Sequence, residues 1–262
     1  MKLKVAMLQM NIEFGDIDKN YHKAEQMINE ACEMYQPNVI VLPELWTTGY
    51  DLININELAD PNVENTSHFL KELAKKYNVS FVGGSIANKT ESGIENTLLV
   101  IDHRGHFIHK YSKLHLFRLM DEHQYLSPGR YMGLFRLFGH QLAGVICYDI
   151  RFPEWIRSHT ARGAEALFVV AEWPMPRLAH WRALLIARAI ENQCYVIACN
   201  RSGDDPNNHF AGHSIVIDPW GEIVAEADDT ESVLIAEIDL RKTREVREMI
   251  PVFSDRRPEY YQ

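Results

Sequence analysis

Apolar runs typical of β-strands alternate with amphipathic helical segments along most of the chain. Residues 3–10 form a predicted strand, and residues 18–35 form a predicted helix with Ala24, Met27 and Ile28 at helical spacing. Further strands are predicted over 80–86, 134–147 (one or two strands), 166–171, 195–199, 212–218 and 232–238, a hairpin over 97–113 turning at Arg104-Gly105, and helices over 67–77, 153–162 and 177–193. This alternation predicts an α/β protein.

The length and composition fit one domain. The chain has 262 residues, of which 46% are apolar, and this is enough to form a substantial hydrophobic core. Because no repeat, linker or low-complexity tract marks a boundary, we predict a single domain over 1–262. Its core is expected over about 3–240, and a C-terminal arm over about 241–262. The end of that arm, 253–262, is rich in Arg, Pro and Tyr and is a candidate dimer contact.

The net charge limits the possible partners. A charge of −9 argues against sequence-independent binding to nucleic acid or to acidic membranes, because both need a basic face. No apolar run reaches the roughly 20 residues that a helix needs to cross a bilayer. We therefore expect a cytoplasmic protein whose partner is a small molecule, with no nucleic-acid or membrane partner.

The cysteines and histidines give no metal pattern. The four cysteines are Cys32, Cys147, Cys194 and Cys199. They contain no C-x-x-C pair, and we expect them to be reduced. Three histidines lie near a predicted hairpin turn, at His103, His106 and His109. Their spacing separates neighbours onto opposite faces of a strand, and no carboxylate or cysteine stands at ligand spacing, so metal binding is not expected.

Cys147 is a candidate nucleophile. It stands at the end of an apolar run, 142–146, and Pro153 begins a predicted helix six residues later. A strand end holds a side chain rigidly, and a nearby helix N-terminus lowers the cost of thiolate charge. The alternative is that Cys147 is a small buried hydrophobe, as many free cysteines are.

Two further charged residues follow strand-like segments. Glu44 comes just after the apolar run 39–42 and a proline, and Lys113 ends the predicted hairpin. Taken singly, Glu44 is more typical of a solvated acid at a strand end, and Lys113 of an ordinary surface lysine. In open α/β sheets, however, sites form outside the carboxyl ends of strands, so Glu44, Lys113 and Cys147 can converge there.

Three segments resemble, in order and in spacing, the signature motifs of the nitrilase superfamily of carbon–nitrogen hydrolases. They are residues 42–44 (Leu-Pro-Glu), 111–117 (Tyr-Ser-Lys-Leu-His-Leu-Phe) and 147–154 (Cys-Tyr-Asp-Ile-Arg-Phe-Pro-Glu). The resemblance runs from the strand at Leu3 to the closing strands near residue 239. It implies a four-layer αββα sandwich, subunits that pair as a homodimer, and catalysis without a metal or an organic cofactor.

The resemblance also implies roles for individual residues. Cys147 would be the nucleophile, Glu44 the general base, and Lys113 the cation that supports the developing oxyanion. Glu122 matches a second glutamate that positions the lysine and the substrate, and we choose it over Asp121. The alternative for Glu122 is an exposed acid in a loop.

Amide hydrolysis calls for these residue types independently of any family. An amide carbon is a poor electrophile, so the Cys147 proton must be removed as attack proceeds. Glu44 suits that task if the apolar residues before it bury the carboxylate. Lys113 and the backbone N–H of Tyr148 would then stabilise the oxyanion. Protonated Glu44 would give its proton to the leaving amine, which departs as ammonia. The same glutamate would then deprotonate a water molecule, and this water would hydrolyse the thioester on Cys147.

The substrate is less constrained. Trp173 follows a strand, where it lines a small pocket or packs in the core. Residues 172–174 and 180–193 resemble the ω-amidase branch, which implies 2-oxo acid amides such as 2-oxoglutaramate or 2-oxo-4-methylthiobutyramate. The acid end of such a substrate needs a cation, and Arg201, Arg151 or another residue would provide it.

Other functions would use some or all of Glu44, Lys113 and Cys147. A nitrilase and an N-carbamoyl amino acid hydrolase would employ the same triad on different carbon–nitrogen bonds. A thiol redox sensor would use Cys147, activated by Lys113 and resolved by another cysteine. A binding module would carry a vestigial triad. We favour a hydrolase because each chemical role is filled by a suitable residue type.

Overall fold

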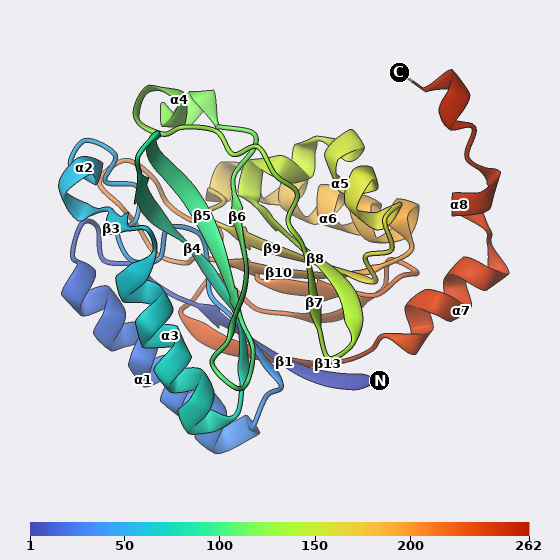
Figure 1. Ribbon diagram of the computed structural model, residues 1–262, viewed down its shortest axis with the longest axis horizontal. Helices are drawn as coiled ribbons and strands as arrows, with labels where there is room; N and C mark the ends of the chain where they lie inside the picture. Colours follow the sequence, from blue (N-terminus) through green and yellow to red (C-terminus); the bar gives the residue numbers. More distant parts are fainter. Residues whose placement is uncertain (262) are drawn as a thin grey trace.

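The computed structural model describes residues 1–261 and contains two β-sheets (Figure 1). The first sheet has the strand order β13, β1, β2, β4, β5, β6, and the short β3 pairs with β4. Its strands are β1 (Lys2–Gln9), β2 (Val39–Val41), β3 (Asp60–Pro61), β4 (Ser80–Thr90), β5 (Gly93–Ile101), β6 (Phe107–Ser112) and β13 (Ser232–Asp239). Strands β1, β2 and β4 run parallel, whereas β5 and then β6 each reverse direction. The carboxyl ends of β2, β4 and β6 therefore share one edge of the sheet.

The second sheet has the order β12, β11, β10, β9, β8, β7. Its strands are β7 (Leu134–Leu137), β8 (His140–Ile146), β9 (Ala166–Ala171), β10 (Tyr195–Asn200), β11 (Ile215–Ile217) and β12 (Ile223–Glu226). Its three central strands, β8, β9 and β10, are parallel, so they also end at one common edge.

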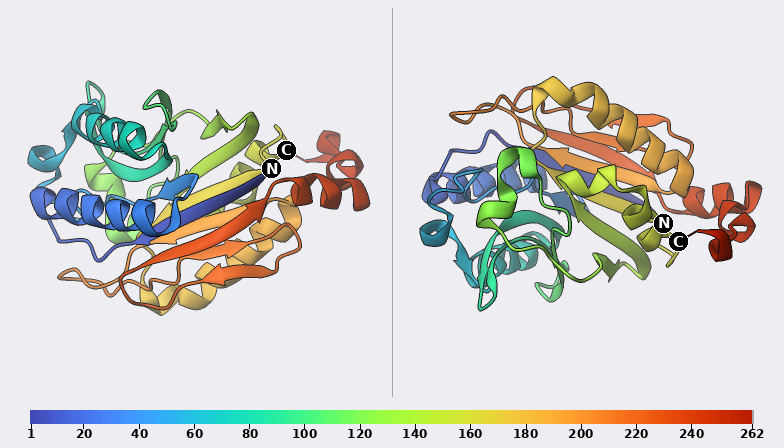
Figure 2. Two further views of the ribbon diagram at one scale, coloured as in Figure 1. Left: turned by 90° about the horizontal axis from the view of Figure 1, so that it is seen from below. Right: turned by 90° about the horizontal axis from the view of Figure 1, so that it is seen from above.

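The two sheets pack face to face because their strands are apolar on both sides. In β1, Val5 and Met7 join the core between the sheets, and Ala6 and Leu8 join the core beneath the helices. Helices α1 (Ile17–Tyr35) and α3 (Glu64–Tyr77) cover the outer face of the first sheet, and α5 (Pro153–Thr160) and α6 (Leu178–Asn192) cover that of the second (Figure 2). The expected four-layer αββα sandwich is confirmed.

Most predicted elements are present, with local differences. The predicted strand over 212–218 begins only at Ile215, because Gly212 and His213 have φ of +61° and +49°, which an extended strand does not allow. Strands β3 and β12 and the one-turn helices α2 (Ile55–Leu58) and α4 (Glu122–Tyr125) were not predicted. Each is four residues or shorter, too short to show a repeating apolar pattern.

The C-terminal segment leaves the sandwich (Figure 1). It contains α7 (Arg241–Met249), α8 (Val252–Asp255) and a short 3₁₀ turn at Pro258–Tyr260. Arg247 fastens α7 to the body by donating to the carbonyl oxygens of Ala164 and Gln193, at 2.7 and 3.2 Å. Beyond α7 no side chain of the described segment is fully buried. Along residues 1–261, every helix is too short or too polar to cross a membrane.

Candidate active site

Charged side chains from both sheets meet at the shared carboxyl edge. Glu44 follows β2, Lys113 follows β6, Cys147 follows β8, and Glu172 follows β9. The backbone N–H of Glu172 donates to Oε2 of Glu44 at 2.9 Å, which ties the edge of one sheet to the edge of the other. All four side chains are buried. The structure therefore rules out the interpretation of Glu44 and Lys113 as solvated surface charges.

Lys113 forms ion pairs with both of the predicted glutamates. Its Nζ atom lies 2.8 Å from Oε1 of Glu44 and 2.6 Å from Oε1 of Glu122. Burial alone would lower the pKa of Lys113, but the two carboxylates outweigh it and raise that pKa well above its ordinary value. Lys113 is therefore a fixed cation at neutral pH.

Glu122 lies in the first turn of α4 and is fully buried, so it is not an exposed loop acid. Its Oε2 atom accepts the backbone N–H of Phe117 at 2.7 Å. Burial raises the pKa of Glu122, while the nearby ammonium of Lys113 opposes that shift. The neighbouring Asp121, which we did not choose, is exposed.

Two residues at this site were missed by the sequence analysis. Tyr50 donates its hydroxyl hydrogen toward Oε1 of Glu44, at 3.1 Å, and toward Oε1 of Glu122. Asn96, in β5, donates from Nδ2 to Oε1 of Glu44 at 2.8 Å. Burial first, and then the carboxylates of Glu122 and Glu44, raise the pKa of Tyr50, so its phenol stays protonated and remains a donor. The sequence contained one sign of Asn96: an amide side chain within an apolar strand needs a hydrogen-bond partner.

The turn at Cys147 holds the thiol in a constrained position. Cys147 begins a 3₁₀ turn, Cys147–Arg151, with φ of +44°, a left-handed conformation that is costly for a residue with a Cβ. Asp149 stabilises the turn by accepting the backbone N–H of Ile146 at 3.0 Å and the hydroxyl of Tyr111 at 2.7 Å. It also accepts from His115 Nδ1 at 2.7 Å. These hydrogen bonds hold the turn that carries Cys147 against β6 and β8.

The ionisation of Cys147 differs from the expectation. Burial, followed by the negative charge of Glu44, raises the pKa of the Cys147 thiol well above its ordinary value, although Lys113 opposes the shift. The helix α5 begins only at Pro153, beyond the 3₁₀ turn, and it does not compensate for burial. The resting thiol is therefore protonated and lies beside a carboxylate that can accept its proton.

A narrow pocket opens onto the Cys147 thiol. Its lining residues are Phe117, Met120, Cys147, Tyr148, Arg151, Glu172, Trp173, Pro174 and Arg177. The free volume is about 10 Å³, room for roughly one water molecule, so a larger ligand requires the lining side chains to move. The pocket includes Tyr148 and Trp173, and Trp173 also packs in the hydrophobic core, so both alternatives for Trp173 are met.

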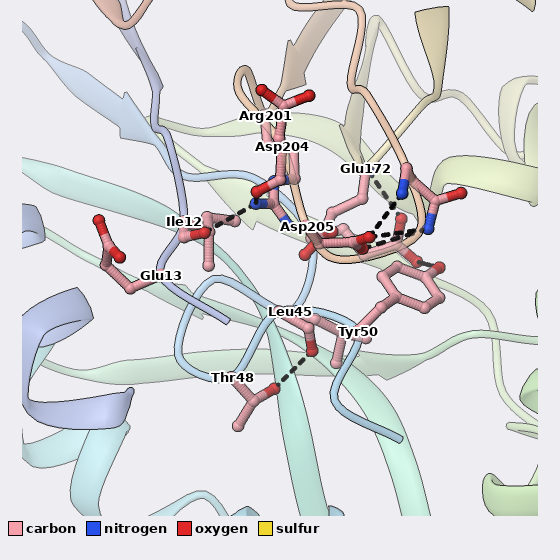
Figure 3. A network of polar contacts seen from close by, with 12 residues as sticks. Ile12, Glu13, Leu45, Thr48, Tyr50, Glu172, Arg201, Asp204 and Asp205 are labelled. Carbon is pink, nitrogen blue, oxygen red and sulfur yellow. Dashed lines mark hydrogen bonds and ion pairs between the residues drawn. The ribbon is translucent and has the colours of Figure 1, made fainter. Parts of the chain in front are cut away.

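Arg201 does not reach this pocket. It is fully buried, and it donates to Oε2 of Glu172 at 2.7 Å and to the carbonyl oxygen of Ile12 at 2.7 Å (Figure 3). Burial raises the pKa of Glu172, although the Arg201 guanidinium acts in the opposite direction. Arg201 thus forms a buried ion pair with Glu172, which argues against it among the alternatives named for the acid end of the substrate. Arg151 does line the pocket, and so does Arg177, which the sequence analysis missed.

The other candidate groups lie apart from this site. Within residues 1–261, no cluster of three or more histidine, cysteine or acidic side chains has the arrangement of a metal site. The four cysteines are free and buried. Burial raises the pKa of Cys32 to about 11 and that of Cys194 to about 12, so both thiols are unreactive at neutral pH.

The αββα sandwich and its buried Glu-Lys-Cys cluster define a class of hydrolase, and comparison with known proteins shows the family. The chain belongs to the carbon-nitrogen hydrolase family, whose model matches residues 4–248. It is 53% identical to the 2-oxoglutaramate amidase of Bacillus subtilis (strain 168), over 100% of both chains. It is 38% identical to the omega-amidase YafV of Escherichia coli (strain K12), over 97% of this chain and 96% of the relative.

The solved structures agree with the family. Nit3 of Saccharomyces cerevisiae, a member of branch 10 of the nitrilase superfamily, superposes with a TM-score of 0.91 at 30% sequence identity. The match covers 98% of this chain and 97% of that chain. The protein is an amidase of the nitrilase superfamily, a hydrolase that acts on amide carbon–nitrogen bonds.

Proposed function

We propose that the protein releases ammonia from the terminal amide of a 2-oxo acid, such as 2-oxoglutaramate, through a thioester on Cys147. The observation that carries this proposal is that Cys147, which lies within the influence of the buried Glu44–Lys113 ion pair, lines the same pocket as the guanidinium of Arg151. The names of the 53% and 38% identical relatives point to the same class of substrate.

The catalytic roles follow from the contacts. Glu44 takes the Cys147 proton as sulfur attacks the amide carbon, and the resulting oxyanion is stabilised by Lys113 and by the N–H of Tyr148. The Tyr148 N–H belongs to the first turn of a helix, where donors have no partner within the helix. Protonated Glu44 then gives its proton to the leaving nitrogen, and ammonia departs. Water attacks the thioester, Glu44 accepts a proton from it, and the carboxylate product and the thiol form.

Arg151 is the cation best placed to hold the acid end of the substrate. It lines the pocket, and its guanidinium carbon lies 4.8 Å from the centre of the Trp173 ring. Stacking on an aromatic face leaves guanidinium N–H donors for a carboxylate, and one of them, on Nη2, lies 3.3 Å from Nδ1 of His180. In this proposal Trp173 serves by orienting Arg151.

We also propose that the protein forms a homodimer and acts in the cytoplasm. The arm over about 241–262 carries exposed apolar side chains, among them Met249, Ile250 and Tyr260, which suit a contact with a second copy and hence a homodimer. The core over about 3–240 then acts as the catalytic unit. The free cysteines suit a reducing compartment, and we propose the cytoplasm.

Ammonia release tests the proposal directly. The substrates are 2-oxoglutaramate, glutamine, a simple nitrile and an N-carbamoyl amino acid, and the variants are Cys147→Ala and the control Cys32→Ala. We expect release selective for the oxo acid amide, lost in Cys147→Ala and kept in Cys32→Ala. Preference for the nitrile or the carbamoyl compound would favour the alternative hydrolases. If turnover is absent and activity of any kind depends on a disulfide, the protein is a redox sensor instead.

A further inference from the structure

Two arginines line the Cys147 pocket without an acidic partner. Three arginines on neighbouring elements pair with carboxylates: Arg201 with Glu172, Arg188 with Glu191, and Arg182 with Glu226. By contrast, neither Arg151 nor Arg177 forms an ion pair with any residue of the described chain. A protein of net charge −9 thus keeps two unneutralised guanidinium groups at one small pocket.

Each of these guanidinium groups is held by an aromatic ring. The guanidinium carbon of Arg177 lies 5.5 Å from the centre of the Phe117 ring, and that of Arg151 lies 4.8 Å from the Trp173 ring. Both rings line the pocket. Stacking restricts the side chains but uses none of their N–H donors. Nη2 of Arg151 lies 3.3 Å from Nδ1 of His180, and the other donors can bind ligand oxygens at low entropic cost.

The main chain fixes the position of Arg177 independently of its side chain. Its carbonyl oxygen accepts from Trp173 Nε1 at 2.8 Å, and its N–H donates to the carbonyl oxygen of Pro174 at 3.1 Å. Arg177 is also the residue that precedes α6. A substitution of its side chain therefore leaves the local backbone contacts intact.

Along residues 1–261, the acidic groups around Cys147 have basic partners, whereas two of the basic groups have no acidic partner. Lys113 pairs with both Glu44 and Glu122, and Glu172, which lines the pocket, pairs with Arg201. Neither Arg151 nor Arg177 has an ion-pair partner within the described residues. A 2-oxo acid carries a carboxylate and an adjacent carbonyl, three acceptor oxygens on two neighbouring carbons. One guanidinium edge binds two oxygens side by side, so a second guanidinium is needed to bind the third.

We propose that Arg177 is a specificity-determining residue that binds the 2-oxo acid end of the substrate jointly with Arg151. This inference rests on the proposed function and extends it, because it makes recognition of the substrate a task of two arginines. Arg177 contacts a part of the substrate distant from the scissile bond, so it contributes mainly to binding and little to the chemical step.

The test compares Arg177→Gln with wild type on 2-oxoglutaramate and on pentanamide, a neutral amide of the same chain length. We expect KM for 2-oxoglutaramate to rise by about tenfold or more, with kcat changed less than about threefold. Kinetics on pentanamide should stay at the wild-type level. Arg177→Lys should recover part of the affinity for the oxo acid, since it restores the charge without the planar fork.

The matched control is Arg182→Gln, which removes one positive charge from α6 where the arginine pairs with Glu226. Its KM for 2-oxoglutaramate should not change. The proposal is overturned if KM in Arg177→Gln is unchanged, or if both substrates lose activity equally, because an equal loss indicates a structural role through Phe117. If the proposed function itself is wrong, the wild-type protein releases no ammonia from 2-oxoglutaramate. The role of Arg177 is then rejected as well.

Discussion

The ammonium of Lys113 lies between the carboxylates of Glu44 and Glu122, at 2.8 and 2.6 Å, and all three side chains are fully shielded from solvent. Two carboxylates share one cation, so the cluster carries one excess negative charge when all three groups are ionised. A buried charge of that kind is costly unless it is well hydrogen-bonded. Tyr50, Asn96 and the backbone N–H of Glu172 provide these hydrogen bonds to the cluster.

Replacing Glu122 with glutamine removes one of the two charges that hold Lys113. We expect kcat to fall roughly a hundredfold, because the ammonium that we propose to stabilise the oxyanion is no longer fixed, while the side-chain volume is kept. Steady-state ammonia release measures this. The control is Asp121→Asn, at an exposed neighbouring residue whose left-handed φ of +57° asparagine tolerates, and it should retain wild-type activity. Equal losses in both variants would remove Glu122 from the active site.

Tyr50→Phe deletes the hydroxyl that donates to the two glutamates. The buried carboxylates lose a donor, so we expect a loss of about 1–3 kcal/mol in the free energy of unfolding and a fall in kcat of about tenfold. Urea denaturation and steady-state kinetics measure the two effects. Tyr21→Phe is the control, since its hydroxyl bonds Thr66 far from Cys147, and it should lower stability without changing kcat. Normal kinetics in Tyr50→Phe would show that its hydroxyl does not support the cluster.

The pH dependence of Cys147 alkylation reports the influence of Glu44. Burial and the Glu44 charge hold the thiol pKa above its ordinary value, so iodoacetamide should react slowly at neutral pH and faster as pH rises. In Glu44→Gln the negative neighbour is gone and Lys113 remains, so the thiol pKa falls and the alkylation profile moves to lower pH. Glu154→Gln, at an exposed position on α5, is the control and should leave the profile unchanged. A Glu44→Gln profile identical to wild type would argue against contact between the two groups.

Arg201→Met should destabilise the fold by about 3–5 kcal/mol, because Glu172 is left as an uncompensated buried acid. Without the guanidinium, the raised pKa of Glu172 rises further, and folding then favours the protonated acid. Stability is therefore retained best at low pH and lost as pH rises through the folded-state pKa. Thermal unfolding at about pH 6 and about pH 9 checks the direction. The double variant Arg201→Met/Glu172→Gln should recover much of the loss, and a failure to do so would place the cost in packing.

The strands and helices were predictable because their signals are local, whereas their arrangement as a four-layer sandwich was implied by the resemblance to the nitrilase superfamily. Apolar strand-forming runs, such as the one before Glu44, and helical spacing, such as that of Ala24 and Ile28, are set by residues close in sequence. The short strands and one-turn helices were missed, since their conformation depends on neighbours across the fold. The positive φ of His213 likewise gave no sign in the sequence, and it displaced the predicted start of β11.

By itself, the sequence determined the layered α/β architecture and the identities of Glu44, Lys113 and Cys147 as candidate catalytic groups. Each of these residues follows a strand-like segment, and each has the side chain that its chemical role requires. Only the tertiary structure decided which partners surround them. In the folded protein Tyr50 and Asn96 donate to Glu44, and Arg201 pairs with the buried Glu172. These contacts join residues from separate strands and loops. The energy of such contacts depends on distance and burial, and a linear pattern of residues contains neither.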